Sequence, residues 1–404
     1  MVRIPVGRRA GGKTQGGRTA GGKGRNDEGT NDRAAAQGDA GTDGNATQRA
    51  ATGGLVAVGG RLTARRLPGT GVVTDRLIAL DLGTSRVRAW RPRQGVVFDE
   101  PSVVAYDLNR GIAFAFGEPA QQMTGRTPPG MGTVAPLDGG AVTDFEAARV
   151  LARHVIDTAR PGRFALRPTV ATAVPVESRG IHLKALQQAL LQAGANKAIT
   201  VPTPLAAAVG AGVPIERETG TMVVDLGGGT SDMAVFAFGR IVSATSLTVA
   251  GVALDRALTT WARRRHRVDL GPAAAEQVKI AAGEGRSVEV KARRTEYGTP
   301  ILARFEPDDV HRAMAPVVDV IVQGMGNLLT RCPTELSADI TEHGIVLTGG
   351  GARDAWLGAT LEERLALPVH HVPEPETCTA RGLGVLAASA RGATHVDAHA
   401  SAGS

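Results

Sequence analysis

The chain has 404 residues, 42% of them hydrophobic and 21% charged, which is typical of a globular protein long enough for two domains and excludes a collagen-like or wholly disordered chain. No apolar run approaches the roughly 18 residues of a membrane-spanning helix. The two cysteines, Cys332 and Cys378, lack the spacing of a metal site or a disulfide framework, so we expect buried thiols in a cytoplasmic protein.

The excess positive charge lies at the start of the chain. Residues 1–76 contain 13 Lys and Arg against 6 Asp and Glu, whereas the remaining residues contain 33 of each. We expect a disordered leader over 1–75, because its glycine-rich basic composition cannot bury enough apolar surface. Three interpretations stay open: a solvated tail, a stretch upstream of the true start codon, or an arm for anionic lipid or polyanions. Sequence-specific nucleic-acid binding is not expected, since the leader has no aromatic residues for stacking.

From about residue 76, short β-type runs alternate with helical periodicity, which predicts an α/β fold. The predicted elements are strands over 76–81, 87–91 and 95–98, a helix over 145–156, a strand over 169–176 and a helix over 181–193. The first three strands form a β-meander. Thr143 and Glu146 have the spacing of a capping box for the first helix, and Gly194 ends the second.

One motif occurs twice and predicts the architecture. An apolar strand, then Asp-Leu-Gly, then a hydroxyl-bearing turn is found at residues 77–85 and again at 222–231. The second copy also begins a meander, with strands over 231–238 and 240–245. The duplication predicts two domains of similar plan that face each other.

Both Asp-Leu-Gly turns carry groups that bind phosphate. A triphosphate needs backbone N–H groups, hydroxyl donors and a cation, and glycine-rich turns at strand ends supply the first two. The candidate donors are Thr84, Ser85, Arg86, Gly227, Gly228, Gly229 and Thr230. Asp81 and Asp225 stand at the strand ends, where a carboxylate can hold the waters around Mg²⁺. One such turn alone is as often an ordinary hairpin, but a pair in the same context is more specific.

Two further segments suit a nucleoside. A third glycine turn at 347–352 follows the apolar strand 345–347 and lets a flat base lie against backbone; the alternative is a strand-to-helix turn. Residues 275–279 are predicted to be helical, which places Glu276 and Lys279 on one face. Glu276 can accept from ribose hydroxyls while Lys279 lies over the nucleoside, and the alternative is a solvated salt bridge between the two.

Several blocks resemble MreB, the bacterial actin homologue, in order and nearly without gaps from about residue 76 to 390. They are residues 81–84, 100–105, 143–146, 193–195, 204–212, 225–230, 275–279, 347–352 and 374–378. Chaperones of the DnaK type and sugar kinases share the phosphate turns but not the blocks at 100–105 and 204–212.

The resemblance implies an α/β class, duplicated actin-like ATPase fold, with a five-stranded mixed sheet and flanking helices in each domain. The first domain would span 76–220 with an insert at about 95–140, and the second 221–390 with an insert at about 253–310, before a disordered tail over 391–404. ATP and Mg²⁺ would lie in the cleft between them. Besides the phosphate turns, the implied contacts are Glu276, Gln277, Val278 and Lys279 on the ribose side and Gly349, Gly350, Gly351 and Ala352 at the adenosine.

The resemblance further implies filaments at the inner face of the cytoplasmic membrane that organise cell shape and peptidoglycan synthesis. The implied partners are further copies of the chain, other MreB paralogues, and cell-wall elongation and shape proteins. The loop 160–167 matches the family's membrane element and offers Phe164 and Leu166 among arginines. A buried packing role for Phe164 is the alternative.

The chain departs from the family on the catalytic side of the cleft. The family's water-orienting glutamate aligns with His182, and Glu177 lies five residues earlier. Without that carboxylate we expect at most a slow ATPase, with His182 and Asp225 as the catalytic candidates; the alternative is an alignment displaced by a few residues. Arg86 replaces a polar residue of the family's first turn and would strengthen phosphate binding by its fixed charge.

The sequence leaves three functions open for this chain. The first is a filament-forming, ATP-binding cell-shape protein, and the second is a degenerate paralogue that binds nucleotide without efficient hydrolysis and modulates other MreB filaments. The third is an actin-fold phosphotransferase or chaperone-type ATPase. It is disfavoured because we find no base with a sugar site, and only a short tail follows Ala390.

Overall fold

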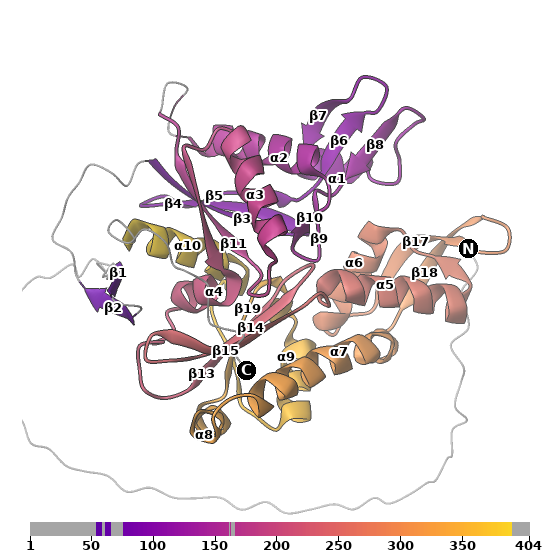
Figure 1. Ribbon diagram of the computed structural model, residues 1–404. Coiled ribbons are helices and arrows are strands. Elements are labelled where there is room, and N and C mark those ends of the chain that lie inside the picture. The colour runs from indigo at the N-terminus through magenta and orange to yellow at the C-terminus, as the bar shows by residue number, and fades with distance from the viewer. Residues whose placement is uncertain (1–53, 59–60, 66–75, 161, 163–165, 390–404) are drawn as a thin grey trace, which may run out of the picture. The chain divides into compact units, whose positions relative to one another are not determined.

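The computed structural model describes residues 54–58, 61–65, 76–160, 162 and 166–389 (Figure 1). The disorder expected for residues 1–53 and for the tail over 391–404 concerns residues outside this description. Within the expected leader, β1 (Gly54–Val58) and β2 (Arg61–Arg65) pair antiparallel. The structure therefore differs from the expectation of a wholly disordered leader at this hairpin.

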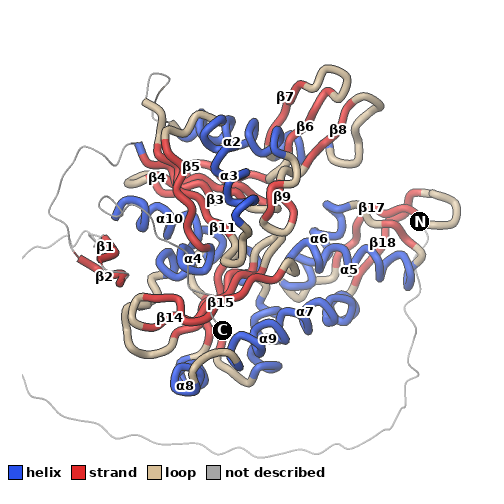
Figure 2. Tube along the Cα trace, viewed as in Figure 1, coloured by secondary structure: helices blue, strands red, loops and turns tan. Residues whose placement is uncertain are grey.

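Five strands form the first sheet, in the order β12-β11-β3-β4-β5. Figure 2 labels β3, β4, β5 and β11 of this sheet. They are β3 (Leu77–Leu82), β4 (Arg86–Arg91), β5 (Gly95–Pro101), β11 (Thr169–Val174) and β12 (Lys197–Pro202). The predicted meander is present, because β3, β4 and β5 pair antiparallel. β11 lies parallel to β3, and β12 lies parallel to β11.

Helices cover both faces of the first sheet. They are α2 (Phe145–Ala159), α3 (Gly180–Gln192), α4 (Thr203–Ala211) and α10 (Cys378–Ser389). Because side chains alternate along a strand, Ile78 and Leu80 of β3 pack with α2 and α3, whereas Leu77 and Ala79 pack with α4 and α10. The C-terminal helix α10, expected in the second domain, thus packs against the first sheet.

The first turn of α2 differs from the predicted capping box. The N-cap residue is Asp144, whose Oδ1 accepts a hydrogen bond of 2.8 Å from the backbone N of Ala147. The hydroxyl of Thr143 instead donates to the carbonyl of Pro136 at 3.2 Å. A capping box with Thr143 is therefore wrong by one residue, because that hydroxyl is used by the preceding turn.

The second sheet repeats the plan of the first, in the order β15-β14-β13-β19-β20. Its strands are β13 (Thr221–Leu226), β14 (Ser231–Ala237), β15 (Arg240–Leu247), β19 (Ile345–Thr348) and β20 (Val369–His371). β13, β14 and β15 are antiparallel, and β19 and β20 continue the sheet in parallel. The equal order and direction of the strands confirm the predicted duplicated α/β fold.

Helices also cover the second sheet. They include α7 (Pro307–Thr330), α8 (Thr334–His343) and α9 (Ala355–Leu365). By length and composition alone α7 could cross a membrane, but its Val318 and Ile321 lie in the core with Met233 of β14. On the other face, Ala207 and Ala208 of α4 pack with Phe236. Helix α4 therefore contacts both sheets.

Each half carries one insert. The first contains β6 (Val104–Asp107), β7 (Ile112–Phe116), α1 (Glu118–Met123), β8 (Met131–Val134), β9 (Leu137–Asp138) and β10 (Ala141–Val142). The second contains α5 (Gly251–Trp261), the π-helix η2 (Ala262–His266), β16 (Val268–Asp269), α6 (Pro272–Gly283), β17 (Val288–Arg294) and β18 (Pro300–Phe305). Two short 3₁₀ helices, η3 (Gly350–Arg353) and η4 (Pro375–Thr377), precede α9 and α10.

Candidate functional site

The two Asp-Leu-Gly turns face each other. A Cβ atom added to Gly228 would lie 2.1 Å from the Ser85 Oγ, and one added to Gly229 would lie 2.2 Å from the Thr84 Oγ1. The absence of side chains at these glycines therefore lets the hydroxyls of the first turn approach the backbone of the second. Of the predicted phosphate donors, Thr84 and Ser85 are therefore brought together with Gly228 and Gly229.

The two turns also have the same internal geometry. Gly83 N donates to the carbonyl of Arg86 at 3.1 Å, and Gly227 N donates to the carbonyl of Thr230 at 2.9 Å. In each turn a backbone hydrogen bond thus joins the glycine to the residue three positions later. The N–H groups of the residues between these two positions are available to an anion.

Asp81 and Asp225 lie near the ends of β3 and β13, and the Asp81 carboxyl acts on Asp225. Burial raises the pKa of Asp81 to about 6, and the nearby Arg88 guanidinium opposes the rise. Burial and the Asp81 carboxyl raise the pKa of Asp225 to about 7. Because a neighbouring negative charge disfavours ionisation, the two carboxyls do not both ionise readily, and a bound cation would relieve the repulsion between them. The oxygen donor set suits Mg²⁺ held through water.

Lys279 reaches the second turn from α6. Its Nζ is 2.8 Å from Asp255 Oδ1 and donates to the carbonyl of Gly251 at 3.3 Å. A Cβ atom on Gly251 would lie 3.6 Å from this Nζ and 3.4 Å from the carbonyl oxygen of Gly227. Lys279 therefore pairs with Asp255, and the alternative of a simple Glu276–Lys279 salt bridge is wrong.

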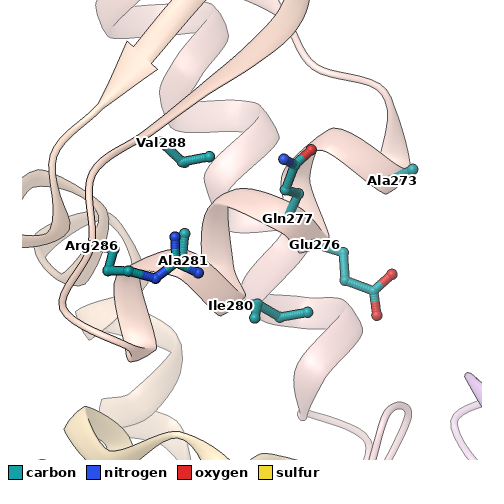
Figure 3. Close-up of a pocket in the computed structure, with 7 residues that line it drawn as sticks. All are labelled: Ala273, Glu276, Gln277, Ile280, Ala281, Arg286 and Val288. Carbon is teal, nitrogen blue, oxygen red and sulfur yellow. The ribbon is translucent and has the colours of Figure 1, made fainter.

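The other three residues predicted on α6 have different surroundings. Val278 is fully buried in the core of the second half, and its contact with a nucleotide stays a prediction. Glu276 and Gln277 line a pocket of about 290 Å³ between α6 and the start of β17 (Figure 3). Ile280, Arg286 and Val288 complete much of its wall.

The third glycine turn lies on the end of β13. Gly349 adopts a positive φ of 82°, and a Cβ there would lie 2.5 Å from the carbonyl oxygen of Leu226. A Cβ on Gly351 would meet the Cβ of Leu226 at 2.8 Å, whereas nothing lies within 4 Å of one on Gly350. Ala352 is buried, and its backbone N donates to the carbonyl of Gly349 at 3.2 Å. The turn therefore adjoins the second phosphate turn.

Arg86 has a partner outside the opposite turn, and His182 is exposed. The Arg86 Nε forms an ion pair with Asp99 Oδ1 at 2.7 Å, and its Nη2 donates to the Asp99 carbonyl at 3.0 Å. This guanidinium is thus bound to β5 and is not aimed at the opposite turn. His182 lies exposed in the first turn of α3, while Glu177 Oε1 accepts a 2.8 Å hydrogen bond from Thr245 Oγ1.

Sequence reasoning missed three polar residues at the site. Thr348 Oγ1 and Thr379 Oγ1 both donate to Asp225 Oδ1, at 2.9 and 3.3 Å. Asp232 is fully buried on β14, directly opposite Asp225 in the strand ladder. Of these three residues, only Asp232 could have been inferred from the sequence, because it lies two residues after Thr230 and alternate residues of a strand share one side.

Of the two predicted membrane residues, only Leu166 can be placed. Its side chain is 60% exposed, which leaves it available to a surface. Phe164 lies outside the described residues, so both interpretations of it stay predictions.

The comparisons with known proteins agree with this geometry. Residues 75–394 match the family model described as MreB/Mbl protein. The cell shape-determining protein Mbl of Bacillus subtilis (strain 168) is 35% identical over 317 residues, which cover 77% of this chain and 95% of Mbl.

Two solved structures also superpose well. Spiroplasma citri MreB5 bound to ADP is 30% identical, with a TM-score of 0.72 over 76% of this chain and 94% of MreB5. A MamK double helical filament is 25% identical, with a TM-score of 0.66 over 77% of this chain and 98% of that one. The chain therefore belongs to the MreB/Mbl family of actin-like, cell shape-determining proteins.

Proposed function

We propose that the chain binds ATP with Mg²⁺ between its two Asp-Leu-Gly turns and assembles into filaments that organise cell shape. The observation that carries the proposal is the meeting of the two turns, with Thr84 and Ser85 against Gly228 and Gly229. The solved relative MreB5, which was determined with ADP, supports the choice of ligand.

Each part of the site has a role in this proposal. The backbone N–H groups of both turns donate to phosphate oxygens, and Lys279 adds a cation next to the second turn. Asp81 and Asp225 hold Mg²⁺ through its waters, and that ion neutralises phosphate charge. Glu276 and Gln277 take the ribose side, and the backbone of Gly349 and Gly350 takes the adenosine.

Hydrolysis is slow in this proposal. His182 is exposed at the start of α3 and has no carboxylate with which to orient a water molecule. Glu177 is engaged by the Thr245 hydroxyl. A nucleotide that is bound tightly and cleaved slowly acts chiefly as a structural ligand.

The filament would lie on the inner face of the cytoplasmic membrane, with cell-wall elongation and shape proteins as partners. The MamK structure, which is a double helical filament, supports self-association, and the exposed Leu166 supports membrane contact. Arginines 160 and 167 flank this loop and suit anionic lipid.

The test is electron microscopy of the purified full chain with Mg²⁺ and ATP on anionic liposomes. We expect ordered double filaments on the lipid, loss of liposome binding but not of filaments in Leu166→Asp, and loss of filaments in Gly229→Val. Monomers that bind ATP would support the modulating paralogue instead. Failure to bind any adenine nucleotide would overturn the proposal.

A further inference from the structure

A second set of contacts joins the two halves beside the phosphate turns. The backbone N of Val176, which follows β11 of the first sheet, donates to Asp232 Oδ1 on β14 at 3.3 Å. One residue on, Glu177 Oε1 accepts from Thr245 Oγ1 on β15 at 2.8 Å. These four residues, Val176, Glu177, Asp232 and Thr245, are named the clasp.

Asp232 is the centre of the clasp. Its Oδ1 also accepts from Ser246 Oγ of β15 at 2.6 Å. Asp232 lies two residues after Thr230, which belongs to the second phosphate turn. A single fully buried side chain therefore connects β14 and β15 of the second half to the backbone of the first half.

The neighbourhood of the clasp is tightly packed. A Cβ atom on Gly140 would lie 2.4 Å from Pro175 Cγ and 3.1 Å from Thr230 Cγ2. Pro175 precedes Val176, so the same short segment lies against Gly140, which also adjoins Thr230, and donates to Asp232. Movement of β11 away from β14 would break these contacts together.

We infer that the clasp holds the two halves closed around a bound nucleotide, with the Val176–Asp232 and Glu177–Thr245 hydrogen bonds slowing its release. The inference rests on the proposed nucleotide site. Asp232 and Glu177 are positioning residues here, because they act through the contact between the two halves.

The first experiment measures the dissociation rate of a fluorescent ATP analogue from the full chain with Mg²⁺. Thr245→Val and Glu177→Ala should each release it roughly fivefold faster, the effect of one ordinary hydrogen bond. Thr245→Ser and Glu177→Gln keep a donor and an acceptor, so both should stay within about twofold of the unaltered protein. In a double-mutant cycle, Glu177→Ala with Thr245→Val should be no faster than either alone.

Substitution of Asp232 should change the release rate more, and it offers a second pair of one disruptive and one conservative variant. Asp232→Ala removes the acceptor for the Val176 amide and the Ser246 hydroxyl, so release should accelerate roughly tenfold or more. Asp232→Asn keeps a carbonyl oxygen for these donors and should release the analogue within about threefold of the unaltered rate. Equal rates in all variants, or equal damage by the conservative and disruptive members of each pair, would overturn the inference.

A nucleotide-free readout separates the inference from the proposed function. The Val176 amide should lose hydrogen-exchange protection in Asp232→Ala and keep it in Asp232→Asn. If the unaltered chain takes up no nucleotide, the proposed site fails, whereas the exchange result still decides whether the hydrogen bond exists. If the nucleotide binds but its release is the same in every variant, only the clasp fails.

Discussion

The two halves of the chain repeat one plan, but they surround their phosphate turns differently. β3 and β13 each begin an antiparallel meander and lead into Asp-Leu-Gly. In the first half Arg88 lies near Asp81, whose pKa burial raises to about 6. In the second half Asp225 has the hydroxyls of Thr348 and Thr379, and its pKa rises to about 7.

The difference teaches that a repeated motif sets the backbone while distant partners set the electrostatics. Thr348 and Thr379 lie 123 and 154 residues from Asp225 along the chain. Arg88, by contrast, lies on the strand adjacent to β3. The Asp81 carboxyl has a nearby cation in Arg88, whereas the Asp225 carboxyl has neutral donors and the carboxyls of Asp81 and Asp232. We therefore expect Asp225 to depend more on Mg²⁺ than Asp81 does.

The largest effect is expected where the two turns touch. Gly229→Val should lower ATP affinity roughly 100-fold or more, because its side chain would fill the space of Thr84 Oγ1 and approach Gly139 N at 3.0 Å. Isothermal titration calorimetry measures the change. Gly180→Ala is the matched control, since nothing lies within 4 Å of its Cβ and it should bind as the unaltered chain does. Normal affinity in Gly229→Val would break the account of facing turns.

The next largest effect is expected on phosphate release, in variants of His182 in the first half. His182→Glu should speed phosphate release at least about tenfold, because a carboxylate at the start of α3 restores an acceptor for the attacking water. His182→Gln, a neutral acceptor, is the control and should remain slow. A phosphate-release assay under single-turnover conditions makes the comparison. Release by the unaltered chain as fast as by His182→Glu would contradict the proposed loss of catalysis.

The pKa contrast between the two carboxyls predicts a pH effect. The folded-state pKa of Asp225 lies above its unfolded value of 3.8, so the folded chain binds more protons in the window between. Without Mg²⁺ and nucleotide, the free energy of unfolding should therefore fall as pH rises from about 4 to 7.

Asp225→Asn sharpens this test. This substitution should reduce the fall in the free energy of unfolding between pH 4 and 7 by more than about 1 kcal/mol, since one pKa unit corresponds to about 1.4 kcal/mol. Urea unfolding at several pH values in EDTA measures it. Mg²⁺ with ATP should also flatten the curve of the unaltered chain, because a bound cation favours the ionised carboxyls. Parallel curves for the two proteins would show that Asp225 is not the group responsible.

The smallest effect is expected at Arg86. Because its guanidinium is exposed and tied to Asp99, Arg86→Ala should cost less than about 1 kcal/mol of stability and change ATP affinity less than about twofold. Lys279→Met, on the second half, should weaken ATP binding more. A tenfold loss in Arg86→Ala would restore this residue to the phosphate site, as the sequence first suggested.

Much of the fold was predictable because its signals are local or repeated. The meanders, the duplicated Asp-Leu-Gly turns and the helices after them follow from alternation, periodicity and glycine placement. The order of the parallel strands and the packing of α10 had no local signal. Gly382 of α10 approaches α4 so closely that a Cβ there would lie 1.8 Å from the carbonyl oxygen of Ala206.

The candidate site was predictable as a set of turns but not as a set of contacts. Val278 shares a helix with Lys279, yet it faces the core because helical neighbours point about 100° apart. Arg86 is held by Asp99, and Lys279 by Asp255, through pairings between separate elements. The clasp joins residues 56 and 68 positions apart, which no spacing in the sequence indicates.

The central claim is that both halves bind one nucleotide. Calorimetric titration of the full chain with Mg²⁺ and ATP tests it most directly. The account predicts saturable heat with one ATP per chain, which disappears in Gly229→Val. No heat from the unaltered chain, together with no displacement of a fluorescent adenine nucleotide, would contradict it.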